Sequence, residues 1–262
     1  MKIGLSTWSL LSLDVISAVR AIGDAEFDYI ELWGEVPHAY PEWVDRRKLR
    51  DALSPYKMTL TMHAPFTDLN PATPFQPVKG AVERTLEDFV KLGDYLGASI
   101  ITVHPGGVHN EALIPRSAES SVATLRKLVA AAGGRLSINV ENQVKSRSKY
   151  HFPLASTSES LILILAEVEG LRFTLDTGHA NVNGQSPLAL AESAGPKLTE
   201  VHLSDNGGAS DDHLIPGEGS LEFKGLMERL VGTEALVCLE LDPHRYTPDR
   251  VLKASALFRS SA

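Results

Sequence analysis

The chain has 262 residues, is 43% hydrophobic and carries a formal net charge of −8. This length suits one of the larger single-domain α/β folds, and the hydrophobic content is enough for a sizeable core. The acidic balance argues against a default nucleic-acid binder, and a single cysteine, Cys238, excludes a disulfide framework.

The N-terminal stretch MKIGLSTWSLLSL has a lysine before an apolar run, as a signal peptide does. However, Ser and Thr interrupt the run, Asp14 follows closely, and there is no small-x-small cleavage site. No stretch approaches the ~20 apolar residues of a membrane span. We therefore expect a cytoplasmic protein with no membrane partner, which also agrees with the lack of disulfides.

Short β-rich runs alternate along the chain with longer amphipathic segments. The predicted strands are KIGLSTW (2–8), DYIELW (28–33), KMTLTMH (57–63), SIITVH (99–104), LSINVE (136–141), LRFTLD (171–176), LTEVHL (198–203) and ALVCLEL (235–241). Helical spacing of apolar residues predicts helices over 15–25, 81–97, 120–133 and 159–170. Helix C-caps are expected at Gly97, Gly133, Gly134 and Gly170.

Alternating strands and helices predict a parallel sheet. Eight such units predict a closed (β/α)8 TIM barrel that forms one domain over residues 1–262. An open doubly wound sheet is the structural alternative. Its usual Gly-x-Gly-x-x-Gly turn is missing after the first predicted strand.

Potential ligands stand at the ends of seven successive predicted strands: Glu31, His63, His104, Glu141, Asp176, His202 and Glu240. In a barrel the C-terminal strand ends form one rim, where active sites lie. Side chains alternate faces along a strand, so that each ligand-type residue shares the lumen face with polar neighbours. Arg172 and Glu200 would also point inward on neighbouring strands, and we expect them to pair.

Each of these residues also has an ordinary interpretation. A lone histidine at a strand end is more often a hydrogen-bonding residue than a ligand, and an acidic residue after a strand is often a helix N-cap. Independent roles would not place four or more such side chains on one face at one end. Imidazoles with carboxylates suit Zn²⁺ or Mn²⁺, so the joint pattern predicts a divalent metal site.

Two local motifs add further candidate ligands. LDTGHA places His179 three residues after Asp176, and SDDHL places His213 two residues after Asp211, in a loop rich in glycine. Both are weak signals, because Asp beside glycine is commonly a turn residue.

The segments TMHAPF, TVHPGG, INVEN, LDTGHAN, VHLSDN, DDHLIPGEGSLEF and LELD, in this order, resemble the xylose isomerase-like TIM-barrel superfamily. That superfamily includes sugar and sugar-phosphate isomerases and epimerases, and also endonuclease IV. The resemblance implies one metal held by Glu141, Asp176, His202 and Glu240. A match to the three-zinc endonuclease IV implies two further sites: one at His63, His104 and Glu141, and one at His179, Asp211 and His213. One to three ions are thus expected.

Two activities remain open. The favoured one is a metal-dependent isomerase or epimerase of a small sugar or sugar phosphate, in which the metal stabilises an enediolate. Glu141 and Glu240 would then act as acid and base, with His179 binding substrate or relaying a proton. Trp8 and Trp33 could wall the sugar.

The alternative is phosphodiester hydrolysis like that of endonuclease IV, with nucleic acid as partner. The ligand count favours it, but the predicted rim loops are poor in the basic residues that phosphate contacts require. The exception is NQVKSRSKYHF (142–152), where Lys145 and Arg147 could hold one phosphate or carboxylate of a small substrate. A solvated loop is the ordinary interpretation of that stretch.

Overall fold

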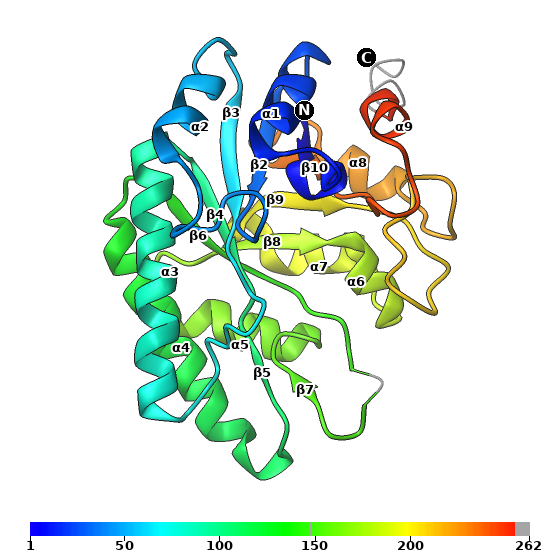
Figure 1. Cartoon of the computed structure of the whole chain (residues 1–262). Coiled ribbons are helices and arrows are strands. Elements are labelled where there is room, and N and C mark those ends of the chain that lie inside the picture. Colours follow the sequence, from blue (N-terminus) through cyan, green and yellow to red (C-terminus); the bar gives the residue numbers. More distant parts are fainter. Residues whose placement is uncertain (147, 255–262) are drawn as a thin grey trace.

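The computed structural model describes residues 1–146 and 148–254, and its centre is a closed parallel barrel (Figure 1). The barrel strands are β1 (Lys2–Ser6), β2 (Tyr29–Trp33), β3 (Thr59–His63), β4 (Ile100–Val103), β6 (Ser137–Glu141), β8 (Arg172–Asp176), β9 (Leu198–Leu203) and β10 (Leu236–Leu239). Each pairs with its neighbours in sequence, and β1 closes the ring against β10, with Lys2 opposite Leu236. The predicted TIM barrel is therefore confirmed.

Helices cover the outside of the barrel (Figure 1). They are α1 (Val15–Asp24), α2 (Arg46–Leu53), α3 (Gln76–Leu96), α4 (Ile114–Ala132), α5 (Ser158–Glu167), α6 (Thr177–Val182), α7 (Pro187–Ala194), α8 (Lys224–Leu230) and α9 (Pro248–Lys253). Short 3-10 turns lie at Thr7–Leu10, Glu111–Leu113 and Gly195–Lys197. None of the helices in the described part of the chain is long and apolar enough to cross a membrane.

The helix boundaries follow local chemistry. The Asp14 carboxylate caps α1 by accepting from the backbone N–H groups of Ile16 and Ser17. Gly97 and Gly133 end α3 and α4 in the left-handed conformation, as predicted. Both helices begin five or six residues before their predicted starts at 81 and 120, because a proline lies in each first turn, where it is well tolerated. The helix α5 ends earlier than predicted, with Val168 rather than Gly170 as its cap.

The barrel has an apolar outer face and a polar lumen, as side-chain alternation predicts. Outward-facing Met62, Ile101 and Phe173 are fully buried under the helices. Inside the lumen, Thr102 Oγ1 and Thr174 Oγ1 lie 2.7 Å apart, and Thr174 accepts from Asn139 Nδ2 at 2.9 Å. The lumen thus contains a network of hydrogen-bonded side chains, and the buried side chains of Tyr29, Ile100, Leu236 and Cys238 form a small cluster of their own.

The predicted pair between Arg172 and Glu200 does not form. A register shift between Phe173 and Thr174 places Thr174, not Arg172, opposite Glu200. Arg172 is exposed at the start of β8, and its Nη1 donates to the Pro196 carbonyl at 3.4 Å. Glu200 is fully buried and accepts instead from Thr102 Oγ1 at 3.1 Å.

A two-stranded antiparallel ribbon was not predicted. It joins β5 (Gly107–Val108), which follows β4, to β7 (Phe152–Pro153), which follows β6. Figure 1 shows the ribbon lying outside the barrel. Gly106 before it has a φ of +83°, and an added Cβ would lie 2.2 Å from Asn70 Oδ1, so glycine is required there. The ribbon forms one wall beside the barrel mouth.

Candidate active site

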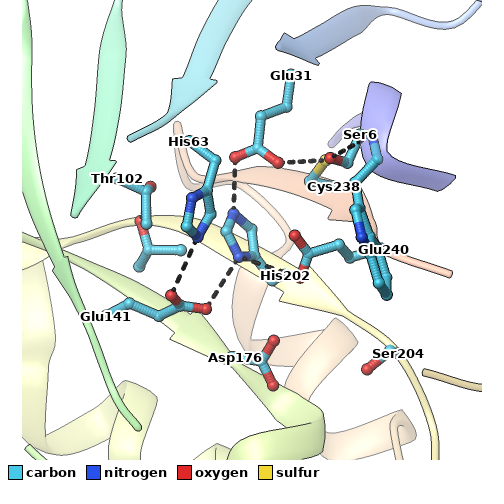
Figure 2. Close-up of polar contacts among 12 residues, drawn as sticks. Ser6, Glu31, His63, Thr102, Glu141, Asp176, His202, Ser204, Cys238 and Glu240 are labelled. Carbon is cyan, nitrogen blue, oxygen red and sulfur yellow. Dashed lines mark hydrogen bonds and ion pairs between the residues drawn. The ribbon is translucent and has the colours of Figure 1, made fainter. Parts of the chain in front are cut away.

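Five of the predicted ligands meet at the C-terminal mouth of the barrel (Figure 2). They are His63, Glu141, Asp176, His202 and Glu240, and the most exposed of them, Glu240, is only 7% exposed. One ligand atom from each of Glu141, Asp176, His202 and Glu240 lies within 4.8 Å of the others. Parallel strands bring these residues together because each strand carries its acidic or imidazole side chain at the same end.

The Glu141 carboxylate is the centre of this cluster. Its Oε1 lies 3.1 Å from His202 Nδ1, and its Oε2 lies 2.7 Å from His104 Nε2 and 3.4 Å from His63 Nε2. Oε2 nevertheless has no assigned hydrogen bond from a described residue. Close approaches of this kind suit ligands that face a common ion.

Three imidazoles are each held by one ring nitrogen, and the other nitrogen faces the site. Nδ1 of His63, His179 and His213 lies 2.9, 2.7 and 3.0 Å from the carbonyl oxygens of Ala64, Asn142 and Glu240. Since a carbonyl can only accept, Nδ1 carries a proton, and Nε2 is the nitrogen that offers a lone pair when the ring is neutral. His202 is held on both sides, with Nε2 2.9 Å from Glu31 Oε2 and Nδ1 3.1 Å from Glu141 Oε1. Orienting the ring through a second partner is typical of metal-binding histidines.

A second cluster lies beside the first. Asp211 Oδ2 lies 3.2 Å from His179 Nε2 and 3.0 Å from His213 Nε2, so the three residues predicted from two separate motifs meet. Their ligand atoms lie within 4.8 Å of one another. The side chains are 11%, 23% and 14% exposed for His179, Asp211 and His213, respectively, so this cluster opens toward solvent more than the first.

The residues present fit a divalent cation. Glu141 Oε2, Asp176 Oδ2 and Asp211 Oδ1 are buried and have no hydrogen-bond partner among the described residues. An unpartnered buried carboxylate oxygen is costly, and a cation bound beside such oxygens would offset that cost. Oxygen and imidazole donors together suit Zn²⁺ or Mn²⁺.

The charges in this site shift one another's protonation. Burial raises the pKa of Asp176 to about 6, helped by the charges of Asp211 and Glu141. Burial also opposes ionisation of Glu141, but the imidazoles of His104, His202 and His63 outweigh it and hold the pKa of Glu141 well below its usual range. Glu141 therefore remains an anion, which is the form that binds metal or accepts a proton.

His104 differs from the other imidazoles. Burial lowers its pKa despite the nearby Glu141 carboxylate, so that its neutral form is favoured. Its ring stacks on Phe66, with centroids 4.5 Å apart. One ligand atom from each of His63, Glu141 and His202 lies within 4.8 Å of the others. Among the described residues, His104 belongs to no such group.

The glycine-rich loop that carries Asp211 and His213 is pinned by Asp205. Asp205 Oδ2 accepts from the backbone N–H groups of Gly217 and Gly219, both at 2.9 Å, and Oδ1 accepts from those of Asn206 and Leu221. A Cβ on Gly219 would lie 2.2 Å from Asp205 Oδ1. These bonds return the loop to the barrel mouth. The following helix α8 starts at Lys224.

Sequence reasoning missed the function of two residues. Glu31 lies in the middle of β2 and contacts His202 from inside the lumen, one layer below the other ligands (Figure 2). Asn142 follows Glu141 directly and binds the Asp176 backbone through both amide atoms, at 2.9 and 2.8 Å. Asn142 was visible in the INVEN segment, but only the folded chain shows that it joins β6 to β8.

A cleft of about 700 Å³ opens beside the clusters. At its inner end it is lined by His104, His179 and Asp211, and farther out by the ribbon and by the predicted residue Lys145. Arg147, predicted with it, lies outside the described residues. Trp8 and Trp33 do not line this cleft. The Trp8 ring lies 4.7 Å from that of His213, and Trp33 contacts His38 with ring centroids 6.0 Å apart.

Residues 17–261 match the protein family described as xylose isomerase-like TIM barrel. Among curated relatives, an uncharacterized protein of Methanocaldococcus jannaschii is 29% identical over 250 residues, covering 92% of this chain and 83% of its own length. The fructoselysine 3-epimerase of Escherichia coli O157:H7 is 25% identical over 278 residues, covering 100% of this chain and 98% of its own length.

Solved structures give the same relationship. A D-tagatose 3-epimerase-like protein has a TM-score of 0.85 at 27% identity and covers 99% of this chain and 96% of its own. A D-psicose 3-epimerase solved in the presence of D-fructose has a TM-score of 0.80 at 15% identity, covering 99% of this chain and 98% of its own, and so shares the fold. The similarity thus extends over nearly the whole barrel.

Proposed function

Because this chain belongs to the xylose isomerase-like TIM-barrel family, we propose that it is a divalent-metal-dependent epimerase or isomerase of a small sugar. One observation supports this most directly: the ligand atoms of Glu141, Asp176, His202 and Glu240 lie within 4.8 Å of one another at the barrel mouth. Its similarity along the full chain to a fructoselysine 3-epimerase and a D-tagatose 3-epimerase-like protein supports a sugar substrate.

In this proposal the four residues hold the metal, Zn²⁺ or Mn²⁺. When bound, it supplies positive charge that stabilises the negative charge developing on the sugar oxygens as a proton leaves carbon. The contact of His202 Nε2 with Glu31 orients the ring so that Nδ1 is directed toward Glu141 and Glu240. The second cluster, with His179, lies at the inner end of the cleft and would bind the sugar hydroxyls or relay a proton.

Glu141 and Glu240 would exchange protons with the substrate. They lie on opposite sides of His202 in Figure 2, and they come from strands β6 and β10, which are separated in the barrel by β8 and β9. Epimerisation inverts one carbon, so a proton must leave from one face and return to the other. Two carboxylates on opposite sides meet this requirement, one acting as base and the other as acid.

The test combines a sugar assay with a metal count. Purified without chelator, the protein is expected to contain zinc or manganese by elemental analysis and to epimerise or isomerise at least one sugar in a ketose panel. Glu141→Gln should lower kcat by about 10²–10⁴-fold. Glu228→Gln, on the exposed surface of α8, is the control and should leave it unchanged. A metal-loaded protein inactive on all ketoses and aldoses would count against the proposal.

An endonuclease IV-like hydrolase is the second candidate, favoured by the cluster of His179, Asp211 and His213. Against it, Lys145 is the sole Lys or Arg among the described residues lining the cleft, and tracking a duplex requires many phosphate contacts. Three zinc ions per chain with cleavage of an abasic-site duplex would establish this candidate. One metal per chain without cleavage would remove it.

A further inference from the structure

The cleft is larger than the part of a sugar that reacts. A free hexose has about twelve non-hydrogen atoms, and at about 30 Å³ each, the share of a water molecule in the liquid, it fills about 360 Å³. The cleft has about 700 Å³. Because its inner end is lined by His104, His179 and Asp211, a sugar bound at the clusters would leave the outer half for another part of the same substrate.

The outer half offers hydrogen-bond donors that have no acceptor. Gln143 Nε2 is buried and has no hydrogen-bond partner among the described residues. Lys145, two residues farther along, makes no ion pair in the described part of the chain, and its ammonium group can only donate. His109 Nδ1 donates to the Tyr150 carbonyl at 3.1 Å, so Nε2 would donate to an anion only from the protonated ring, which stacks on His151 with centroids 4.6 Å apart.

The acceptors in the cleft are placed differently. The Asp211 carboxylate lies at the inner end and is already engaged by His179 and His213. The other carboxylate is that of Asp68, which is exposed. The outer half therefore presents unpaired donors from Gln143 and Lys145, and a group that supplies several acceptor oxygens fits it best.

We propose that this outer half, lined by Gln143, Lys145, His109 and His151, is a subsite for an anionic group carried by the substrate sugar, a phosphate or a carboxylate. The inference rests on the proposed function, since the sugar is placed by the first cluster. An oxyanion accepts charge-assisted hydrogen bonds from an ammonium group and ordinary ones from an amide. The subsite would hold the far end of the sugar while its reacting carbon lies between Glu141 and Glu240.

The experiment compares D-fructose, D-fructose 6-phosphate and a ketohexuronate with its carboxylate at the same carbon. Calorimetry measures the binding of each to the metal-loaded protein, and the assay measures kcat/KM separately. At least one anionic sugar is expected to bind about tenfold or more tightly than D-fructose, and the stronger of the two identifies phosphate or carboxylate as the natural group. Equal binding of all three would overturn the subsite.

Single-residue variants show which side chain causes the preference for an anionic sugar. Lys145→Ala should remove most of the preference for the anionic sugar, whereas binding of D-fructose should change little. Lys149→Ala is the matched control, because that ammonium group lies 5.0 Å from the Tyr150 ring centroid and does not line the cleft. Asp68→Asn should strengthen the preference by removing a like charge. A preference that survives Lys145→Ala would overturn the assignment.

The binding measurements distinguish failure of the proposed epimerase activity from failure of the subsite. If no sugar is turned over but the preference for an anion depends on Lys145, the subsite stands and the proposed epimerase activity fails. If sugars are epimerised but an anionic group brings no advantage, the activity stands and the subsite is wrong.

Discussion

Glu31 holds His202 from inside the barrel: its Oε2 lies 2.9 Å from His202 Nε2, and both side chains are fully buried. Burial disfavours the charged imidazole, but Glu31 first, with Glu240 and Glu141, outweighs it and raises the pKa of His202 well above its usual range. In the metal-free protein both ring nitrogens therefore carry a proton, with Nε2 directed at Glu31 and Nδ1 facing Glu141 and Glu240.

The first prediction concerns metal affinity. Glu31→Gln replaces the carboxylate by a weaker acceptor, so His202 should be held less firmly in its orientation and metal affinity should fall about 10–100-fold. A competition titration with a fluorescent chelator measures this. Tyr29→Phe is the control, because this buried residue of the same strand has a hydroxyl without a hydrogen-bond partner among the described residues. Equal affinities in Glu31→Gln and wild type would refute the positioning role.

The second prediction is that apparent metal affinity rises with pH. Burial lowers the pKa of His202, but Glu31 first, with Glu240 and Glu141, outweighs it and raises that pKa well above its usual range in the metal-free protein. A metal held by His202 must displace the proton on Nδ1. As the pH falls below this raised pKa, the displaced proton should weaken metal binding about tenfold per pH unit. Titrations from pH 6 to 9 test this slope, and a flat profile would show that His202 loses no proton on binding.

The third prediction is that the metal-free protein becomes less stable as the pH rises. The folded pKa of His63, about 9, lies above its ordinary value of 6.5. Its pairing with carboxylates therefore contributes stability fully below pH 6.5, and the contribution is lost as the pH rises through about 9. Chelator-treated protein should unfold at lower denaturant concentration at pH 9 than at pH 6. The variant His63→Asn should show less of this dependence.

The fourth prediction tests the glycine-rich loop. In Gly219→Ala the new Cβ would lie 2.2 Å from Asp205 Oδ1, so the hydrogen bonds that pin the loop cannot all persist. Each donor left without an acceptor costs about 1–3 kcal/mol, and Tm should fall by several degrees. Gly207→Ala is the control in the same loop, since no atom lies within 4 Å of its added Cβ. Equal Tm values for both variants would contradict the pinning role.

The fifth prediction separates the two carboxylates. In D₂O, the wild-type enzyme should introduce deuterium at the inverted carbon of both epimers. Glu240→Gln should still exchange the proton of one epimer, through Glu141, while interconversion falls about 10²–10⁴-fold. The metal content must be measured alongside, because Glu240 is also a proposed ligand. Loss of exchange from both epimers with the metal retained would show that one residue serves both faces.

Much of the site could be predicted before the fold was seen. Parallel barrel strands all end at one rim, so His63, Glu141, Asp176 and His202 could be placed together from strand order alone. Alternation then fixed which side chains point inward, and the buried, polar lumen around Thr102 agrees with it. These inferences use only local periodicity and the symmetry of the barrel, and both can be read from one sequence.

Other features depend on contacts that no local pattern encodes. The pairing of β8 with β9 places Thr174 rather than Arg172 opposite Glu200, and this register is set by how the neighbouring strands pack. Asp205 binds backbone groups twelve and fourteen residues away, at Gly217 and Gly219, so the course of the loop exists only in the folded chain.

The sequence by itself determined the barrel and the residues that line its mouth, because period-2 alternation and strand order suffice for both. Only the tertiary structure decided that Glu31 lies beneath His202 as its partner, and that Lys145 lies on the cleft that leads to Asp211. The depth of a side chain in the lumen and the path of a loop over the rim are set by long-range packing. That packing depends on the whole chain at once.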